Sequence, residues 1–135
     1  MPTEIDLDFV PNKWNVVRNG SGKVRLLAAG PRLLRECLKA VGDAEVEVVA
    51  VTSVKPLDED YLASIRQGDV IVTLEENQLV GGFGSAVNAY LKSAGCKITN
   101  LGVSDKFVPH GSVAEQLAWC KLDSSSIARL LENLS

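Results

Sequence analysis

The chain has 135 residues, of which 46% are apolar, so it can bury the core of one domain and no more. Fourteen basic and 17 acidic residues give a net charge of −3, which argues against nucleic acid as the main partner, because binding a phosphate backbone requires a basic surface. No apolar run is long enough to cross a membrane, and the acidic, polar N-terminus is unlike a secretion signal. The cysteines, Cys37, Cys96 and Cys120, are odd in number and lack metal-binding spacing, so we expect reduced thiols and a cytoplasmic protein.

The first half of the chain predicts an arm, two strands and a helix. Residues 1–13 contain three acidic residues and two prolines without periodicity, and we expect them to be a linker or arm before a domain at 14–135. A short edge strand is predicted at 14–18, and a strong turn signal follows it at Asn19 and Gly20. The next strand covers 24–29. Apolar residues at helical spacing then predict a helix over 32–41, with Gly42 just beyond its end.

The second half continues the alternation. Asp58 is a good N-cap for a short helix that Gly68 would end. The last helix is capped by Asp123 or by one of the three serines that follow it. A loop is expected at 102–112. The other predicted elements are strands at 46–51, 69–75 and 97–101 and helices at 85–94, 113–120 and 124–134.

This alternation predicts an α/β fold of three layers (α/β/α), in which helices cover both faces of a mainly parallel sheet. The pairing of the strand at 14–18 is left open by the residues themselves. The Asn19-Gly20 turn favours a local hairpin with the strand at 24–29, but the connection is long enough for other arrangements.

A glycine-rich stretch preceded by two carboxylates, directly after the apolar strand at 70–74, is the most informative feature. The residues concerned are Glu75, Glu76, Gly81, Gly82 and Gly84. In parallel α/β sheets, ligands and partners meet the chain at such strand ends. Adjacent glutamates point to opposite sides of an extended chain, so they are not a catalytic pair, but one of them can accept backbone N–H groups. The glycines permit positive φ or a close backbone approach, and because the glutamates would repel a phosphate, a structural or interface turn is favoured.

The loop that contains the only histidine, His110, is expected to be an interface as well. No cysteine stands at a strand-to-helix elbow to form a nucleophilic triad with His110, and no second His or Cys lies at metal-ligand spacing. Phe107 and the two residues after it form an apolar stretch that is expected to pack on a neighbour. Trp14 and Trp119 are expected as core or interface anchors, because no basic cluster accompanies them. We therefore predict no catalytic, cofactor-binding or metal residue.

Three segments resemble a known family in the same order. They are Val54-Lys55-Pro56-Leu57-Asp58-Glu59; Val72-Thr73-Leu74-Glu75-Glu76-Asn77 with Gly81-Gly82-Phe83-Gly84-Ser85-Ala86-Val87-Asn88; and Gly102-Val103-Ser104-Asp105-Lys106-Phe107-Val108-Pro109-His110-Gly111-Ser112. This pattern resembles the C-terminal domain of transketolase-type thiamine diphosphate enzymes and is most similar to that of the 1-deoxy-D-xylulose-5-phosphate synthases. Two departures are Thr52-Ser53, where the family often has an arginine or another large residue, and Phe83 between two glycines.

The resemblance implies a five-stranded sheet in the order 1-3-2-4-5, with the first strand antiparallel at the edge. It also implies that thiamine diphosphate and Mg²⁺ belong to two other domains of the complete enzyme, since the family's Gly-Asp-Gly motif does not occur here. We expect an excised piece, a separate subunit or a remnant. It would help to form a homodimer and support the cofactor-binding domains of an enzyme that joins decarboxylated pyruvate to glyceraldehyde 3-phosphate. The alternative is a free-standing module that binds a small anionic ligand at Gly30 and at 81–84.

Overall fold

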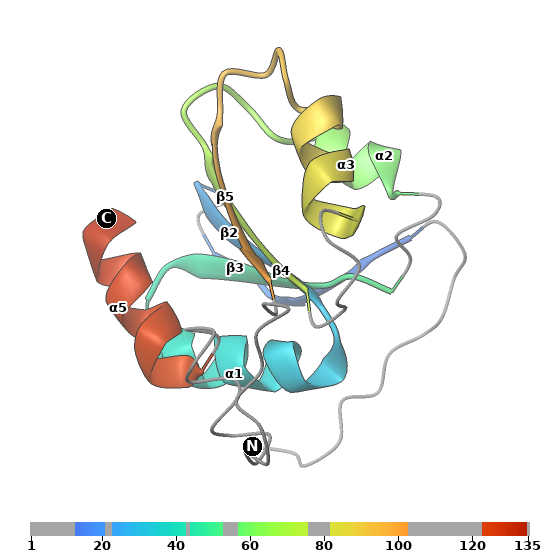
Figure 1. The fold of residues 1–135 in the computed structure, drawn as a ribbon. Helices are drawn as coiled ribbons and strands as arrows, with labels where there is room; N and C mark the ends of the chain where they lie inside the picture. Colours follow the sequence, from blue (N-terminus) through green and yellow to red (C-terminus); the bar gives the residue numbers. More distant parts are fainter. Residues whose placement is uncertain are drawn as a thin grey trace.

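The computed structural model describes residues 13–20, 23–42, 44–52, 57–75, 82–102 and 123–134. The strands and helices within these residues are labelled in Figure 1: β1 (Asn15–Arg18), β2 (Val24–Ala29), α1 (Pro31–Val41), β3 (Val46–Ala50), α2 (Glu59–Ala63), β4 (Val70–Glu75), α3 (Gly82–Tyr90), β5 (Lys97–Gly102) and α5 (Ser124–Leu134).

The five strands form one sheet in the order β1-β3-β2-β4-β5. All neighbours are parallel except β1, which runs antiparallel to β3 at the edge. This confirms the predicted mainly parallel sheet and the strand order that the family resemblance implies. The Asn19-Gly20 turn does not form a hairpin, because β1 takes β3 rather than β2 as its partner.

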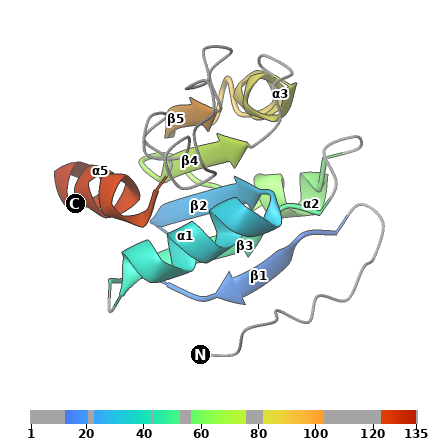
Figure 2. The same ribbon diagram turned by 60° about the horizontal axis from the view of Figure 1, so that its bottom comes forward.

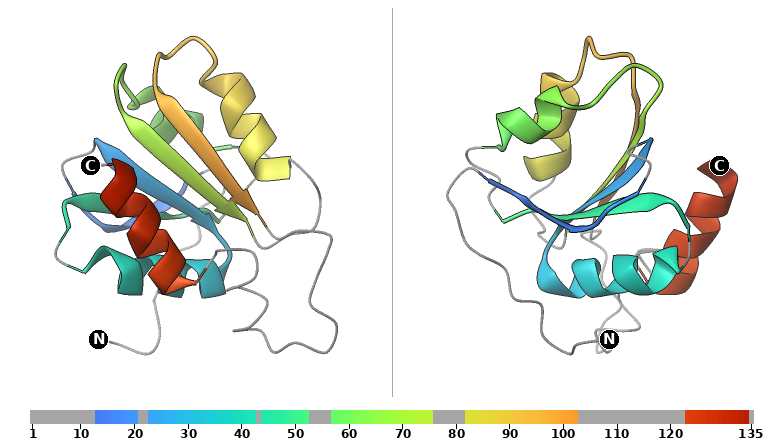
Figure 3. Two further views of the ribbon diagram at one scale, coloured as in Figure 1. Left: turned by 60° about the vertical axis from the view of Figure 1, so that its left-hand side comes forward. Right: turned by 180° about the vertical axis from the view of Figure 1, so that it is seen from behind.

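Helices cover both faces of the sheet, α1 and α5 on one face and α2 and α3 on the other (Figure 1); Figures 2 and 3 show the same layers from other directions. The inner strands are buried on both faces, which explains why they are near-continuous apolar runs in the sequence. Their side chains alternate between the faces: Leu26 and Val72 pack toward α1 and α5, whereas Leu27 and Ile71 pack toward α2 and α3. The predicted three-layer α/β/α fold is therefore confirmed.

Two helices differ from the sequence-based expectation. Asp58 does cap α2, since its side chain accepts a hydrogen bond from the backbone N of Tyr61, but the helix ends at Ala63 instead of continuing to Gly68. Gly68 instead has a positive φ of 89° in a turn before β4. The helix α3 begins at Gly82, three residues earlier than Ser85, so Gly82 and Gly84 lie in its first turn.

Several predicted segments lie outside the described residues. They include the arm at 1–12, most of the loop at 102–112 and the helix at 113–120. Within the described part of the chain, no helix combines the length and the apolar character that crossing a membrane requires.

Candidate functional site: the carboxyl edge

Three parallel strands end at the same level of the sheet. The register pairs Ala29 of β2 with Glu75 of β4, and Glu75 with Gly102 of β5. We call these strand ends, together with the first turn of α3, the carboxyl edge. In open α/β sheets this is the edge where ligands and partners bind, because the connections that follow the strands meet there.

Glu75 holds the first turn of α3. Its Oε2 atom accepts a hydrogen bond from the backbone N of Gly84 at 2.7 Å, and the residue is buried. The first N–H groups of a helix lack partners within the helix and carry a partial positive charge, so a carboxylate there makes a charge-assisted bond. This contact explains why α3 begins at Gly82 despite two glycines in its first turn, which would otherwise disfavour helix.

Gly84 is required for a close approach rather than for a positive φ. A Cβ atom built on Gly84 would lie 2.9 Å from Nδ2 and 3.1 Å from Cγ of Asn100. The Asn100 side chain is held in place, because its Nδ2 donates to Oγ1 of Thr73 at 2.6 Å and its Oδ1 accepts from Nδ2 of Asn88 at 2.8 Å. A chain of hydrogen bonds therefore joins β4, β5 and α3 beside the carboxyl edge.

An aromatic corner, formed by Trp14, Tyr61 and Phe83, adjoins this edge on the α2 and α3 face. The ring centroids of Trp14 lie 5.7 Å from those of both Tyr61 and Phe83, in a tilted and an edge-to-face arrangement respectively. Trp14 and Phe83 are buried. The expectation that Trp14 is an anchor in a core thus agrees with its position, whereas Trp119 lies outside the described residues.

At the opposite end of the parallel strands, where they begin, lies a buried ionic cluster that the sequence analysis did not identify. The Arg25 guanidinium lies 3.7 Å from a carboxylate oxygen of Glu47 and 3.4 Å from one of Asp69, and it donates to Oγ of Ser64 at 3.0 Å. Its carbon also lies 5.5 Å from the centre of the Tyr61 ring. Tyr61 in turn donates a hydrogen bond from its hydroxyl to Glu47. Burial, and then this hydrogen bond to Glu47, raise the pKa of Tyr61.

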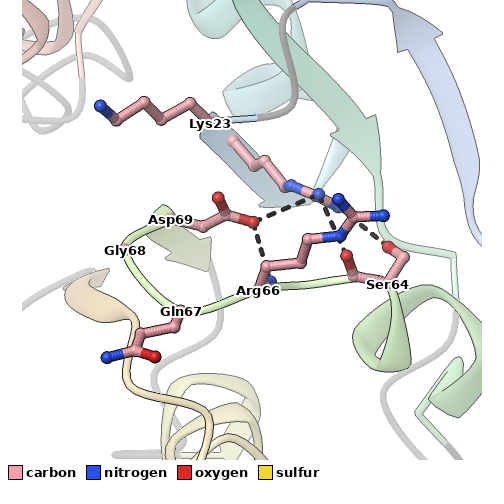
Figure 4. Close-up of a pocket in the computed structure, with 7 residues that line it drawn as sticks. Lys23, Ser64, Arg66, Gln67, Gly68 and Asp69 are labelled. Carbon is pink, nitrogen blue, oxygen red and sulfur yellow. Dashed lines mark hydrogen bonds and ion pairs between the residues drawn. The ribbon is translucent and has the colours of Figure 1, made fainter.

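An open pocket of about 690 Å³ lies beside this cluster, lined by Lys23, Arg25, Ser64, Arg66, Gln67, Gly68 and Asp69. Figure 4 shows the Asp69 carboxylate between the backbone of Arg66 and the guanidinium it binds, while Lys23 and Gln67 extend away from these bonds. The pocket lies where β2 and β4 begin, at the edge of a parallel sheet opposite to the usual binding edge. Since Arg25 is already neutralised by two carboxylates, we interpret the cluster as structural.

Sequence reasoning could have found this cluster from the strand register. Arg25 and Glu47 are each the second residue of an otherwise apolar strand, and the parallel pairing of β2 and β3 places them side by side. Opposite charges at matching positions of two predicted inner strands are therefore a signal for a buried pair.

Of the seven site residues predicted from the sequence, the structure describes three. Glu75, Gly82 and Gly84 come together at the carboxyl edge. The remaining four, Glu76, Gly81, Phe107 and His110, lie outside the described residues, and their roles stay predictions. Within the described ranges, no group of three or more His, Cys, Asp or Glu side chains is arranged to hold a metal ion.

Comparison with known proteins places this geometry in a family. Residues 12–127 match the C-terminal domain of transketolase. The chain belongs to this family. Over 131 residues it is 37% identical to the 1-deoxy-D-xylulose-5-phosphate synthase of Pseudomonas aeruginosa, a match that covers 95% of this chain and 21% of the synthase. The enzyme of the same name from Thermotoga maritima is 42% identical over 129 residues, covering 93% of this chain and 20% of the synthase.

A solved structure supports the same assignment. A split-gene transketolase, in an inactive β4 tetramer, superposes with a TM-score of 0.79 at 25% identity, covering 95% of this chain and 44% of that one. The chain spans about a fifth of the length of the curated synthases it matches. It is therefore homologous to one domain of these enzymes.

Proposed function

We propose that this chain is the non-catalytic C-terminal domain, as a fragment or a separate subunit, of a cytoplasmic thiamine diphosphate-dependent transketolase-type enzyme. We further propose that the enzyme is a 1-deoxy-D-xylulose-5-phosphate synthase, which joins pyruvate, after decarboxylation, to glyceraldehyde 3-phosphate. The observation that carries the proposal is the match of residues 12–127 to the transketolase C-terminal domain, together with 37–42% identity to synthases. Thiamine diphosphate and Mg²⁺ are assigned to other domains of the complete enzyme.

The role proposed for the domain is to form a homodimer and to support the cofactor-binding domains through the carboxyl edge. The hydrogen bond from Gly84 to Glu75 supports this role, because it fixes the first turn of α3 at the edge where partners of α/β sheets bind. Glu76, Gly81, Phe107 and His110 are proposed to extend the same surface. A rigid surface loses less conformational entropy on docking than a mobile one, which favours assembly.

The alternative, a free-standing module for a small anion, is less well supported. Its proposed site includes the start of α3, where the Glu75 carboxylate already accepts the N–H of Gly84. An anion there would have to displace a buried carboxylate and would be repelled by its charge. Calorimetric titration of the chain with inorganic pyrophosphate tests this alternative, and binding below millimolar concentration would favour it over the scaffold function.

A domain replacement tests the proposed function directly. The region of the Thermotoga maritima synthase that matches this chain would be replaced by the 135-residue sequence, and formation of the product from pyruvate and glyceraldehyde 3-phosphate would be measured. The controls are the synthase without that region and a replacement carrying Glu75→Gln. We expect the replacement to restore most of the activity and the dimer. A folded replacement with no more activity than the truncated enzyme would contradict the proposal.

A further inference from the structure

We infer that Trp14 and Asp58 are positioning residues for the carboxyl edge, tying the segment that enters β1 to α2 and to the first turn of α3. The inference rests on the proposed function insofar as it treats this edge as the docking surface. The coupling of Trp14 and Asp58 to α2 and α3 concerns only the chain itself and does not depend on that function.

The antiparallel direction of β1 brings its start to the carboxyl edge. Asn15 pairs with Ala50, the last residue of β3, so the residues before Asn15 lie where the parallel strands end. Oγ1 of Thr52 donates to the carbonyl oxygen of Lys13 at 3.0 Å, which fastens this segment beside the end of β3. Lys13 also forms an exposed ion pair with Asp60 at the start of α2.

A single buried carboxylate joins the entering segment to α2. Oδ1 of Asp58 accepts the backbone N–H of Tyr61 at 3.1 Å, and Oδ2 accepts that of Trp14 at 2.8 Å. Asp58 is only 4% exposed; its bond from Trp14 is buried, and its bond from Tyr61 is partly buried. A helix as short as Glu59–Ala63 is not stable by itself, which makes α2 depend on such tertiary contacts.

The aromatic corner carries the connection on to α3. The Trp14 ring packs edge-to-face on Phe83, with an interplanar angle of 78°. Phe83 is the residue before Gly84, whose N–H is held by Glu75. Packed rings and hydrogen bonds therefore run without interruption from the segment entering β1 to the first turn of α3. Loss of the Trp14 ring should loosen α2 and this turn while leaving α1 and α5 in place.

Amide hydrogen exchange on the full 135-residue chain tests this coupling. The probes are the amides of Tyr61 and Gly84 on one face and of Leu34 and Ile127 on the other, all of them hydrogen-bonded. Trp14→Ala is expected to speed exchange at Tyr61 and Gly84 about tenfold more than at the other two amides, because local opening is governed by local contacts. Trp14→Phe keeps a ring and should restore most of the protection.

Leu131→Ala provides a matched control, since it truncates a similarly buried side chain in α5 on the other face. It should produce the reverse pattern. Equal acceleration at all four amides in Trp14→Ala, or no acceleration, would overturn the inference. If Trp14→Ala does not fold, Asp58→Asn serves instead: it can keep only one of the two bonds and should give the same pattern at smaller amplitude.

A binding measurement separates this inference from the proposed function. The chain would be titrated into the Thermotoga maritima synthase that lacks its matching region. If the unaltered chain does not bind, the proposed function fails, whereas the exchange result still decides the coupling of Trp14 to α3. If it binds, Trp14→Ala should weaken binding more than Leu131→Ala does. Equal weakening would contradict a positioning role.

Discussion

Among the described residues, the α1 and α5 face is packed with aliphatic side chains and one buried thiol, Cys37, whereas the α2 and α3 face combines aromatic rings with buried polar and charged groups. Four buried polar or charged residues belong to the second face, namely Arg25, Asp58, Thr73 and Glu75. The strand residues among them alternate with residues that face α1 and α5, as the pleat requires.

The difference lies in what each kind of contact determines. Aliphatic packing is nondirectional, so it stabilises a helix on a sheet without fixing the position of its ends. A buried carboxylate costs free energy unless its partners are in place, and it therefore specifies where a backbone N–H must lie. Glu75 and Asp58 do this for α3 and α2. The α2 and α3 face is thus the one whose local geometry is suited to presenting the carboxyl edge.

The largest effect is expected from breaking the ionic cluster on the α2 and α3 face. Arg25→Met leaves the Glu47 and Asp69 carboxylates, 13% and 14% exposed, without their cation. Removing one partner of a buried pair typically costs about 3–5 kcal/mol. Urea unfolding would measure the loss.

Lys39→Met is the control, because it removes a cation that is 66% exposed, where Lys39 pairs with Glu36 on the other face, whereas the Arg25 side chain is only 10% exposed. An ion pair whose cation remains in solvent contributes little, so we expect a change within about 0.5 kcal/mol. Similar losses in the two variants would show that burial does not distinguish the two ion pairs.

Truncating the aliphatic face should cost nearly as much but in a different way. Leu33 of α1 is fully buried, and Leu33→Ala is expected to lower the free energy of unfolding by about 2–5 kcal/mol through lost burial and a residual cavity. Thermal unfolding measures this change. Because the contacts of α3 are untouched, a selective increase of exchange at the Gly84 amide would contradict the separation of the two faces.

A smaller effect tests the close approach at Gly84. Gly84→Ala should gain about 1 kcal/mol in helix propensity but lose more by pushing Asn100 from its hydrogen bonds, so we expect a net destabilisation of about 1 kcal/mol. In an Asn100→Ala background the obstruction is removed, and the same change should become stabilising. Chemical denaturation of the four proteins gives the coupling. Equal effects of Gly84→Ala in both backgrounds would show that Asn100 is not the obstacle.

Strands and layers could be predicted from sequence because buried inner strands are nearly continuous apolar runs, as in Val70–Glu75. The start of α2 could be predicted from its N-cap Asp58, but the end of α2 and the start of α3 could not, because tertiary contacts decide them. Local propensity favoured a glycine turn before Ser85. The carboxylate of Glu75, which lies outside the helix in the preceding strand, accepts the N–H of Gly84 and lets the helix begin at Gly82. The partner of β1 was likewise ambiguous locally, and only the family resemblance predicted the pairing with β3.

The last prediction concerns one ionisable group on each face. Burial, and to a lesser degree the Glu36 charge, raise the pKa of the Cys37 thiol in α1 from 9.0 to about 12. Above pH 9 the unfolded chain therefore loses a proton that the folded chain retains, so the free energy of unfolding falls as the pH rises, by at most about 1.4 kcal/mol per pH unit. Tyr61 on the other face also has a raised pKa and acts in the same direction, but only above its ordinary value of 10.0. Cys37→Ala should thus remove most of the fall between pH 9 and 10 and leave a shallower fall at higher pH, to which Tyr61 contributes, as urea unfolding at successive pH values would show. If Cys37→Ala and the unaltered chain lose stability equally between pH 9 and 10, the aliphatic face is not what holds this thiol protonated.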